Sequence, residues 1–143
     1  MKISRAQAEQ IAMGKIADSH LLGCALNWES GKWIYAVRAR NSKGMYEVFI
    51  DAETGELIDI VDETAKYQMK VIQGTAVMGV VDLLDRDAAE QAALQAYPGI
   101  VQEWKAVVDS TGHLAFSFDI QTAAGGFKKV IVAAETRDII KIK

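Results

Sequence analysis

Residues 3–10 read Ile-Ser-Arg-Ala-Gln-Ala-Glu-Gln, and residues 84–91 read Leu-Asp-Arg-Asp-Ala-Ala-Glu-Gln. The two stretches lie 81 positions apart, and further positions match at the same offset: Gly31 with Gly112, Trp33 with Leu114, Tyr35 with Phe116 and Val37 with Phe118. After a one-residue insertion near residues 123–124 the offset becomes 82, and residues 53–54 and 135–136 are both Glu-Thr. A single slip over about 60 positions is typical of a duplicated domain with one variable loop.

The repeat predicts the domain organisation. Residues 1–62 form a first copy, residues 82–143 form a degenerate second copy, and residues 63–81 form an ordered connector between them. Within the connector, residues 74–79 lack the Pro, Ser and charge typical of a flexible linker. Residues 66–72 alternate weakly between polar and apolar side chains, which leaves room for an extra strand there.

Each copy begins with the pattern of a helix. Ser4 with Gln7 three residues later fits a capping box, and Asp85 takes the position of the cap in the second copy. Small and apolar side chains then recur at three- and four-residue spacing: Ala8, Ile11, Ala12 and Ile16 in the first copy, and Ala89, Ala92, Ala93 and Ala96 in the second. This spacing gives each helix one apolar stripe. The alanines predict a close approach of helix to sheet.

Strand patterns follow each helix. Residues 112–121 alternate between large apolar and small or polar side chains, which predicts a strand with one buried face. In the first copy the same alternation assigns these side chains to the buried face: Trp33, Tyr35, Val37 and Ala39. The other face carries Ile34, Ala36, Arg38 and Arg40. This half-apolar outer face is where we expect contact with a partner or between copies.

Tyr46 and a turn complete the candidate residues. Lys128 replaces Tyr46 in the second copy, and a position that tolerates lysine is solvated, so Tyr46 is a further candidate for partner contact. Residues 51–56, Asp-Ala-Glu-Thr-Gly-Glu, predict a tight turn in which Gly55 takes the left-handed conformation. Arg137 stands in place of that glycine in the second copy, so the turn there must differ or carry strain.

The predicted fold is α+β: two tandem repeats, each one helix packed on three or four antiparallel strands.

Residues 3–60 resemble the PepSY domain over nearly its whole length. The positions that carry the resemblance are Ser4, Ala8, Ala12, Gly31, Tyr35, Val37, Gly44, Tyr46, Val48, Asp51, Thr54, Gly55 and Glu56. The most specific part is the turn from Asp51 to Glu56, and residues 84–142 look like a second copy that keeps only part of it. The resemblance implies a helix on an antiparallel sheet, as in the propeptides of some secreted metallopeptidases. The tandem arrangement is similar to the architecture of the β-lactamase inhibitor protein. The family offers no catalytic residue to carry over.

Composition excludes several functions. The 143 residues carry 16 basic and 19 acidic side chains, spread evenly, so the basic stripe of a nucleic-acid binder is missing. No apolar stretch is long enough to span a membrane, and Cys24, the single cysteine, excludes an internal disulfide. His20 and His113 share no ligand-like spacing, and no glycine-rich nucleotide motif occurs. Asp51 and Asp62 have the separation of calcium-loop end ligands, but the glycine position is wrong. We therefore expect no cofactor, no metal and no enzymatic activity.

The leading hypothesis is a non-catalytic protein-binding module that inhibits or modulates a peptidase. One alternative is a module of the cell envelope that senses a peptide or small ligand, and another is a structural domain that forms a homodimer. The resemblance implies a bacterial protein of the periplasm or the exterior. No signal sequence precedes residue 3, so we expect either that one was removed or that the protein is cytoplasmic.

Overall fold

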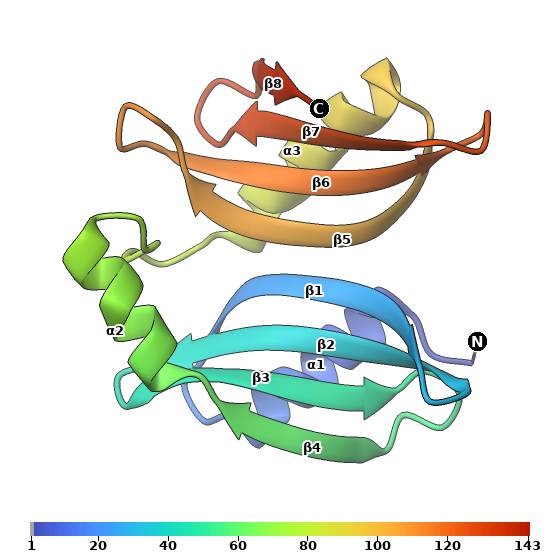
Figure 1. Cartoon of the computed structure of the whole chain (residues 1–143), viewed down its shortest axis with the longest axis vertical. Coiled ribbons are helices and arrows are strands. Elements are labelled where there is room, and N and C mark those ends of the chain that lie inside the picture. Colours follow the sequence, from blue (N-terminus) through green and yellow to red (C-terminus); the bar gives the residue numbers. More distant parts are fainter. Residues whose placement is uncertain (1) are drawn as a thin grey trace. The chain divides into compact units, whose positions relative to one another are not determined.

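The structure is a computed structural model, and it describes residues 2–143. The chain forms two compact units, Met1–Gly74 (unit 1) and Thr75–Lys143 (unit 2). Each unit places a helix against an antiparallel sheet (Figure 1). This confirms the predicted α+β class.

Unit 1 contains two helices and four strands. In chain order these are α1 (Arg5–Lys15), β1 (His20–Glu29), β2 (Lys32–Asn41), β3 (Gly44–Asp51), β4 (Leu57–Asp62) and α2 (Thr64–Gln73). The strands pair in the order β4-β3-β2-β1, each antiparallel to its neighbour. In Figure 1, α1 lies behind this sheet and α2 lies beside it at the left.

The start of α1 is the predicted capping box. The Ser4 hydroxyl accepts the Gln7 amide at 3.2 Å, and the Gln7 side chain accepts the Ser4 amide at 2.8 Å. These bonds satisfy two backbone donors that the helix itself leaves unpaired. Ala8 and Ala12 are fully buried, as are Val37 and Val48 on the sheet. The small alanine side chains thus face the sheet, as the sequence predicts.

Helix α2 occupies the region where the sequence left room for an extra strand, residues 66–72. The helix begins after Glu63, whose side chain makes no capping bond, and the Asp62 carboxylate accepts the Thr64 amide at 2.8 Å. At the other end Gly74 takes a φ of 75° and donates its amide to the carbonyls of Lys70 and Val71. The weak alternation of residues 66–72 fits a strand, but Tyr67 and Val71 are four residues apart, and this spacing also fits a helix.

Unit 2 has one helix and four strands. These are α3 (Leu83–Ala96), β5 (Gly99–Val108), β6 (Leu114–Thr122), β7 (Phe127–Ala133) and β8 (Ile139–Ile142). The strands pair in the order β5-β6-β7-β8, again antiparallel. The fully buried aromatic side chains are Trp104, Phe116 and Phe118.

The cap of α3 differs from the prediction. Asp82, and not Asp85, caps the helix by accepting the Leu84 amide at 2.8 Å. The helix thus begins about one turn earlier, because Asp82 offers an equally good side-chain acceptor. Two members of the predicted apolar stripe, Ala89 and Ala93, are fully buried, whereas Ala92 is half-buried and Ala96 is exposed.

The turn at Arg137 carries the strain that the sequence predicts. Arg137 has a φ of 62°, and Gly55 has a φ of 78°. A residue with a β-carbon is disfavoured in this left-handed region. The turn at Arg137 thus has a left-handed residue, as the turn at Gly55 does, but without a glycine.

Candidate functional site

Four of the five predicted contact residues lie on the same face of unit 1. The Tyr35 hydroxyl donates to the Ile3 carbonyl at 3.2 Å, so the face that carries Tyr35 is the face toward α1. Strand alternation therefore places the other β2 residues on the opposite face, which we call the outer face: Ile34, Ala36, Arg38 and Arg40. Strand β3 adds Met45, Glu47 and Phe49, which lie directly across from Arg40, Arg38 and Ala36.

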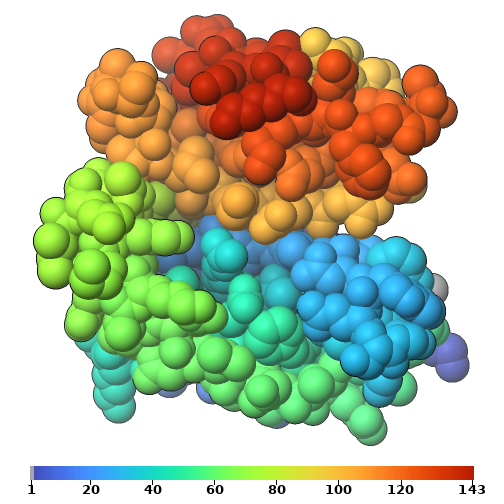
Figure 2. Space-filling view, viewed as in Figure 1, coloured from blue at the N-terminus to red at the C-terminus, as the bar shows by residue number. Residues whose placement is uncertain are grey.

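The apolar part of the outer face is recessed. Ile34 and Ala36 are each only 6% exposed, whereas Phe49 is partly exposed. In Figure 2, β2 and β3 (cyan to green) lie between the protruding helix α2 on the left and the tip of the β1–β2 hairpin on the right. A partner would therefore meet Phe49 and the arginines before it met Ile34 or Ala36.

Arg38 is paired across the strands. Its Nε donates to Glu47 Oε2 at 3.3 Å, and the two side chains are 37% and 19% exposed. A partly solvated pair of this kind contributes at most about 1 kcal/mol to stability. The pair leaves a donor-rich guanidinium and a carboxylate at the surface, which suits polar contacts at the rim of an interface.

Arg40 is engaged by α2. Its Nη1 donates to the Tyr67 hydroxyl, and its guanidinium carbon lies 5.5 Å from the centre of the Tyr67 ring. The Thr64 hydroxyl accepts the Met45 amide at 3.2 Å at the same end of the sheet. Helix α2 thus covers this end of the outer face. Strand alternation alone cannot predict this contact, because it depends on a helix that the sequence pattern does not predict.

Tyr46 lies apart from the other four candidates. It is directly across from Ala39 and alternates with Val48, so its side chain points to the α1 face. Tyr46 is partly exposed. The structure therefore does not bring Tyr46 together with the arginines of the outer face.

The predicted turn at Asp51 forms as a compact hydrogen-bonded loop. Asp51 Oδ1 accepts the amides of Glu53 at 2.8 Å and Thr54 at 3.2 Å, and the Gly55 amide donates to the Asp51 carbonyl at 2.8 Å. The Glu53 amide is the largest cause that lowers the pKa of the Asp51 carboxyl below its usual value. Lys32 lies 3.6 Å from the same carboxylate and adds to the effect. Thr54 accepts the Glu56 amide at 3.1 Å and closes the turn.

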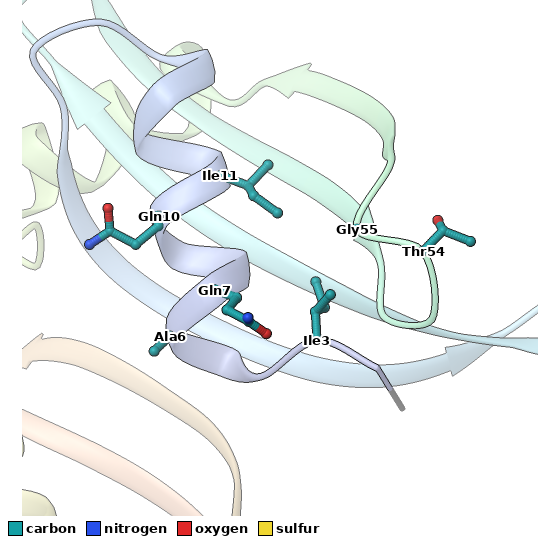
Figure 3. Close-up of a pocket in the computed structure, with 7 residues that line it drawn as sticks. All are labelled: Ile3, Ala6, Gln7, Gln10, Ile11, Thr54 and Gly55. Atoms are coloured by element: carbon teal, nitrogen blue, oxygen red, sulfur yellow. The ribbon is translucent and has the colours of Figure 1, made fainter.

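This turn also forms one wall of a groove of about 510 Å³ in unit 1. Figure 3 shows Ile3 and Ile11 pointing from the α1 side toward Gly55 and Thr54. The complete lining is Ile3, Ala6, Gln7, Gln10, Ile11, Thr54 and Gly55. The groove is mainly apolar with two amide side chains. The one sequence signal for this groove is the four-residue spacing of Ile3, Gln7 and Ile11, which places them on one side of α1.

A smaller pocket of about 420 Å³ lies in unit 2 beside the β5–β6 turn. Asp109 Oδ1 accepts the amides of Thr111 and His113, and the Thr111 hydroxyl contacts both Asp109 Oδ1 at 2.6 Å and His113 Nδ1 at 2.7 Å. The hydroxyl of Thr111 is the largest cause that lowers the pKa of Asp109. These bonds order the turn between β5 and β6.

The remaining sequence candidates stay apart. Cys24 is buried, 3% exposed, on the α1 face of β1, while His20 begins the same strand. Within residues 2–143, no three His, Cys, Asp or Glu side chains converge as metal ligands would. None of the described helices combines the length and apolar character needed to cross a membrane.

Comparison with known proteins identifies the first unit. Residues 2–61 match the family model described as "Peptidase propeptide and YPEB domain", PepSY, and this part of the chain is a PepSY domain. No curated protein matches the sequence significantly.

Two solved structures are similar to the chain. One is the crystal structure of a "putative lipoprotein (CD1622)" from Clostridium difficile 630, with 21% identity and a TM-score of 0.63 over 99% of this chain and 93% of the other. The second is YpmB protein from Bacillus subtilis, with 16% identity and a TM-score of 0.36 over 99% and 98% of the two chains. The first likeness extends over both units and shows a shared fold.

Proposed function

We propose that the chain is a non-catalytic protein-binding module that modulates a peptidase outside the cytoplasm of a bacterium. The observation that carries the proposal is the PepSY domain at residues 2–61, whose family description names peptidase propeptides. The lipoprotein name of the Clostridium difficile structure supports the compartment. Function resides in sites placed on a fold, so we assign the contact to a defined surface.

The proposed contact surface is the outer face of unit 1. It offers Phe49 as a partly exposed aromatic anchor, with the Arg38–Glu47 pair beside it. Aromatic and arginine side chains are the types that most often dominate binding energy. Helix α2 gives this surface a wall through the contact of Tyr67 with Arg40.

We further propose that unit 2 is a second copy of the same domain, at residues 82–143, with residues 63–81 as the connector. Three amide-to-carbonyl hydrogen bonds of the β3–β4 hairpin recur in the β7–β8 hairpin. In unit 1 they run from Asp51 to Glu56, from Gly55 to Asp51 and from Ala52 to Trp33. In unit 2 the corresponding bonds run from Ala133 to Asp138, from Arg137 to Ala133 and from Ala134 to Leu114. The β6–β7 loop, where Thr122 pairs with Gly126, is one residue longer than the β2–β3 loop, where Asn41 pairs with Gly44. This is where the sequence offset slips. Each first strand also has a bulge, at residues 21–23 and 101–103.

Inhibition in trans tests the function. The chain is titrated into the secreted zinc metallopeptidases encoded by the same genome, with thermolysin as a reference, and cleavage of a fluorogenic peptide is followed. We expect loss of activity of at least one peptidase near a one-to-one ratio. The variant Phe49→Ala should weaken that inhibition about tenfold or more, as loss of an aromatic hot spot does.

The matched control is Phe127→Ala, which removes an exposed phenylalanine from unit 2 instead. It should inhibit like the unaltered chain. Full activity of every peptidase at a tenfold excess of the chain would contradict the proposed function. Equal loss of inhibition in both variants would contradict the proposed surface.

A further inference from the structure

The outermost strands of the two units carry matching patterns of apolar and charged side chains. Residues 58–60 of β4 are Ile-Asp-Ile, and residues 140–142 of β8 are Ile-Lys-Ile. The four isoleucines are 38–47% exposed. Among residues 2–143, β4 pairs with β3 alone and β8 with β7 alone. Each strand therefore has one edge where backbone groups face no other strand, and such an edge can template a further strand.

The two edges have opposite charge. The charged side chains in and beside β4 are all acidic: Glu56, Asp59, Asp62 and Glu63. In and beside β8, the basic Arg137, Lys141 and Lys143 outnumber the single acidic Asp138. We propose that β4 of one copy of the chain pairs with β8 of a second copy, with Asp59 facing Lys141. The partner is a second copy of the chain because the chain itself contains β4, a strand whose exposed isoleucines and acidic side chains complement β8. It does not depend on the proposed function.

The faces of the two strands are compatible. Asp59 is directly across from Phe49, so it lies on the outer face of unit 1, away from α1. Lys141 is directly across from Ile131, which alternates with the fully buried Val130 and Val132, so it lies away from the core of unit 2. When β4 and β8 extend one another's sheets with their cores on the same side, Asp59 and Lys141 fall on the same face.

The remaining side chains also match. With Asp59 opposite Lys141, either strand direction places the isoleucines of residues 58–60 beside those of residues 140–142. Ile58 and Ile140 each lie at a register shift in their own sheet, so Ile60 and Ile142 are the isoleucines in regular register. Cross-strand pairs of apolar residues and of opposite charges both stabilise a sheet. The pairing would also cover apolar side chains that each unit alone leaves partly in water.

In a single chain, the Ile60 amide at the free edge of β4 donates to a neighbouring side chain. Asp59 Oδ1 accepts this amide at 2.8 Å. In the paired state a β8 carbonyl takes over that amide, and the Asp59 carboxylate becomes available to the Lys141 ammonium. The exchange keeps every hydrogen-bonding group satisfied, but it makes the association weak and dependent on salt.

Sedimentation velocity tests the association. At low salt and chain concentrations from about 10 to 500 µM, the range suited to a weak interface, we expect the mean mass to rise above the 15.6 kDa of one chain. Lys141→Glu should raise the dissociation constant about tenfold, because it replaces attraction with repulsion. Lys43→Glu in the β2–β3 turn makes the same charge change and should leave the constant unchanged within about twofold. Asp59→Lys combined with Lys141→Glu should restore association.

A chain that stays monomeric throughout this range would overturn the proposal, even if an acidic strand peptide bound to β8, because the occupant would then be another protein. An equal effect of Lys141→Glu and Lys43→Glu would overturn it too. A disulfide trap gives an independent readout: a mixture of Asp59→Cys and Lys141→Cys chains should form a covalent heterodimer, since directly opposed residues lie within bridging distance. Crosslinking no faster than in a mixture of Lys43→Cys and Lys141→Cys chains would count as refutation.

Discussion

Replacing Arg137 with glycine should stabilise unit 2. Arg137 occupies the left-handed region at φ 62°, in the turn between β7 and β8, and its amide donates to the Ala133 carbonyl at 2.9 Å. In unit 1, Gly55 makes the same backbone bond, to Asp51 at 2.8 Å, with a φ of 78°. The fold thus requires the conformation in both hairpins, but only unit 1 has the residue that adopts it without steric cost.

The magnitude follows from three terms. A residue with a β-carbon in the left-handed region costs about 1–2 kcal/mol, which Arg137→Gly removes. Glycine adds about 0.5–1 kcal/mol of conformational entropy to the unfolded chain, which opposes the gain. The substitution also removes an ion pair with Asp85 at 3.7 Å. Both groups are nearly half exposed, so this loss costs about 0.3 kcal/mol. The net expectation is a stabilisation of about 0.5 kcal/mol.

Thermal and urea unfolding followed by circular dichroism measures this change. A gain of this size raises Tm by about 2–4 °C if unit 2 unfolds by itself. Arg137→Ala is the matched control, since it removes the ion pair and the long side chain but keeps the β-carbon. The reasoning is refuted if Arg137→Gly is no more stable than Arg137→Ala.

Three further predictions concern the turns and α2. Ala133→Asp should stabilise unit 2 by about 0.5–1 kcal/mol in urea unfolding, because it supplies the carboxylate that Asp51 provides in unit 1. Asp51→Asn should reduce the loss of stability in acid. Folding lowers the pKa of Asp51, so this carboxylate stabilises the fold above its unfolded-state pKa, and the stabilisation disappears as pH falls through its folded-state pKa. Urea midpoints measured between about pH 6 and 2 test this. Gly44→Ala should destabilise unit 1 by about 1–3 kcal/mol, since its β-carbon would lie 2.1 Å from the Thr64 hydroxyl oxygen, whereas Gly14→Ala near the end of α1 meets no atom within 4 Å and should be neutral or stabilising by up to about 1 kcal/mol.

The strand and helix patterns were predictable because they depend on local periodicity. The capping box at Ser4, the buried alanines and the left-handed Gly55 each follow from the preferences of single residues. The cap of α3 was harder to predict, because Asp82 and Asp85 are both good caps and only the packing of the helix selects between them. Helix α2 was not predictable for a different reason: its ten residues mix polar and apolar side chains in an order that fits both the strand period and the helix period.

The candidate surface was predictable only in part. Alternation along β2 correctly groups Arg38 and Arg40 on one face, but it cannot show that a later helix reaches Arg40 through Tyr67. The sequence groups Tyr46 with them because Lys128 stands at the matching position of the proposed second copy. That substitution indicates solvation and carries no information about the face. The register with Ala39 supplies that information, and register depends on the whole hairpin.

The two units distribute their stabilising groups differently. Under the proposed duplication, bulky side chains on the sheet of unit 2 take the places of smaller or more polar ones in unit 1: Trp104 for Cys24, Phe116 for Tyr35, Phe118 for Val37 and Ile120 for Ala39. All four larger side chains are fully buried, and the Arg86 guanidinium lies 4.8 Å from the Trp104 ring centre. The helix side of both cores is formed by small residues, Ala89 and Ala93 in α3 and Ala8 and Ala12 in α1, all of them fully buried. A core with this much apolar surface offsets a turn that has lost its aspartate and its glycine, so unit 2 tolerates a strained hairpin.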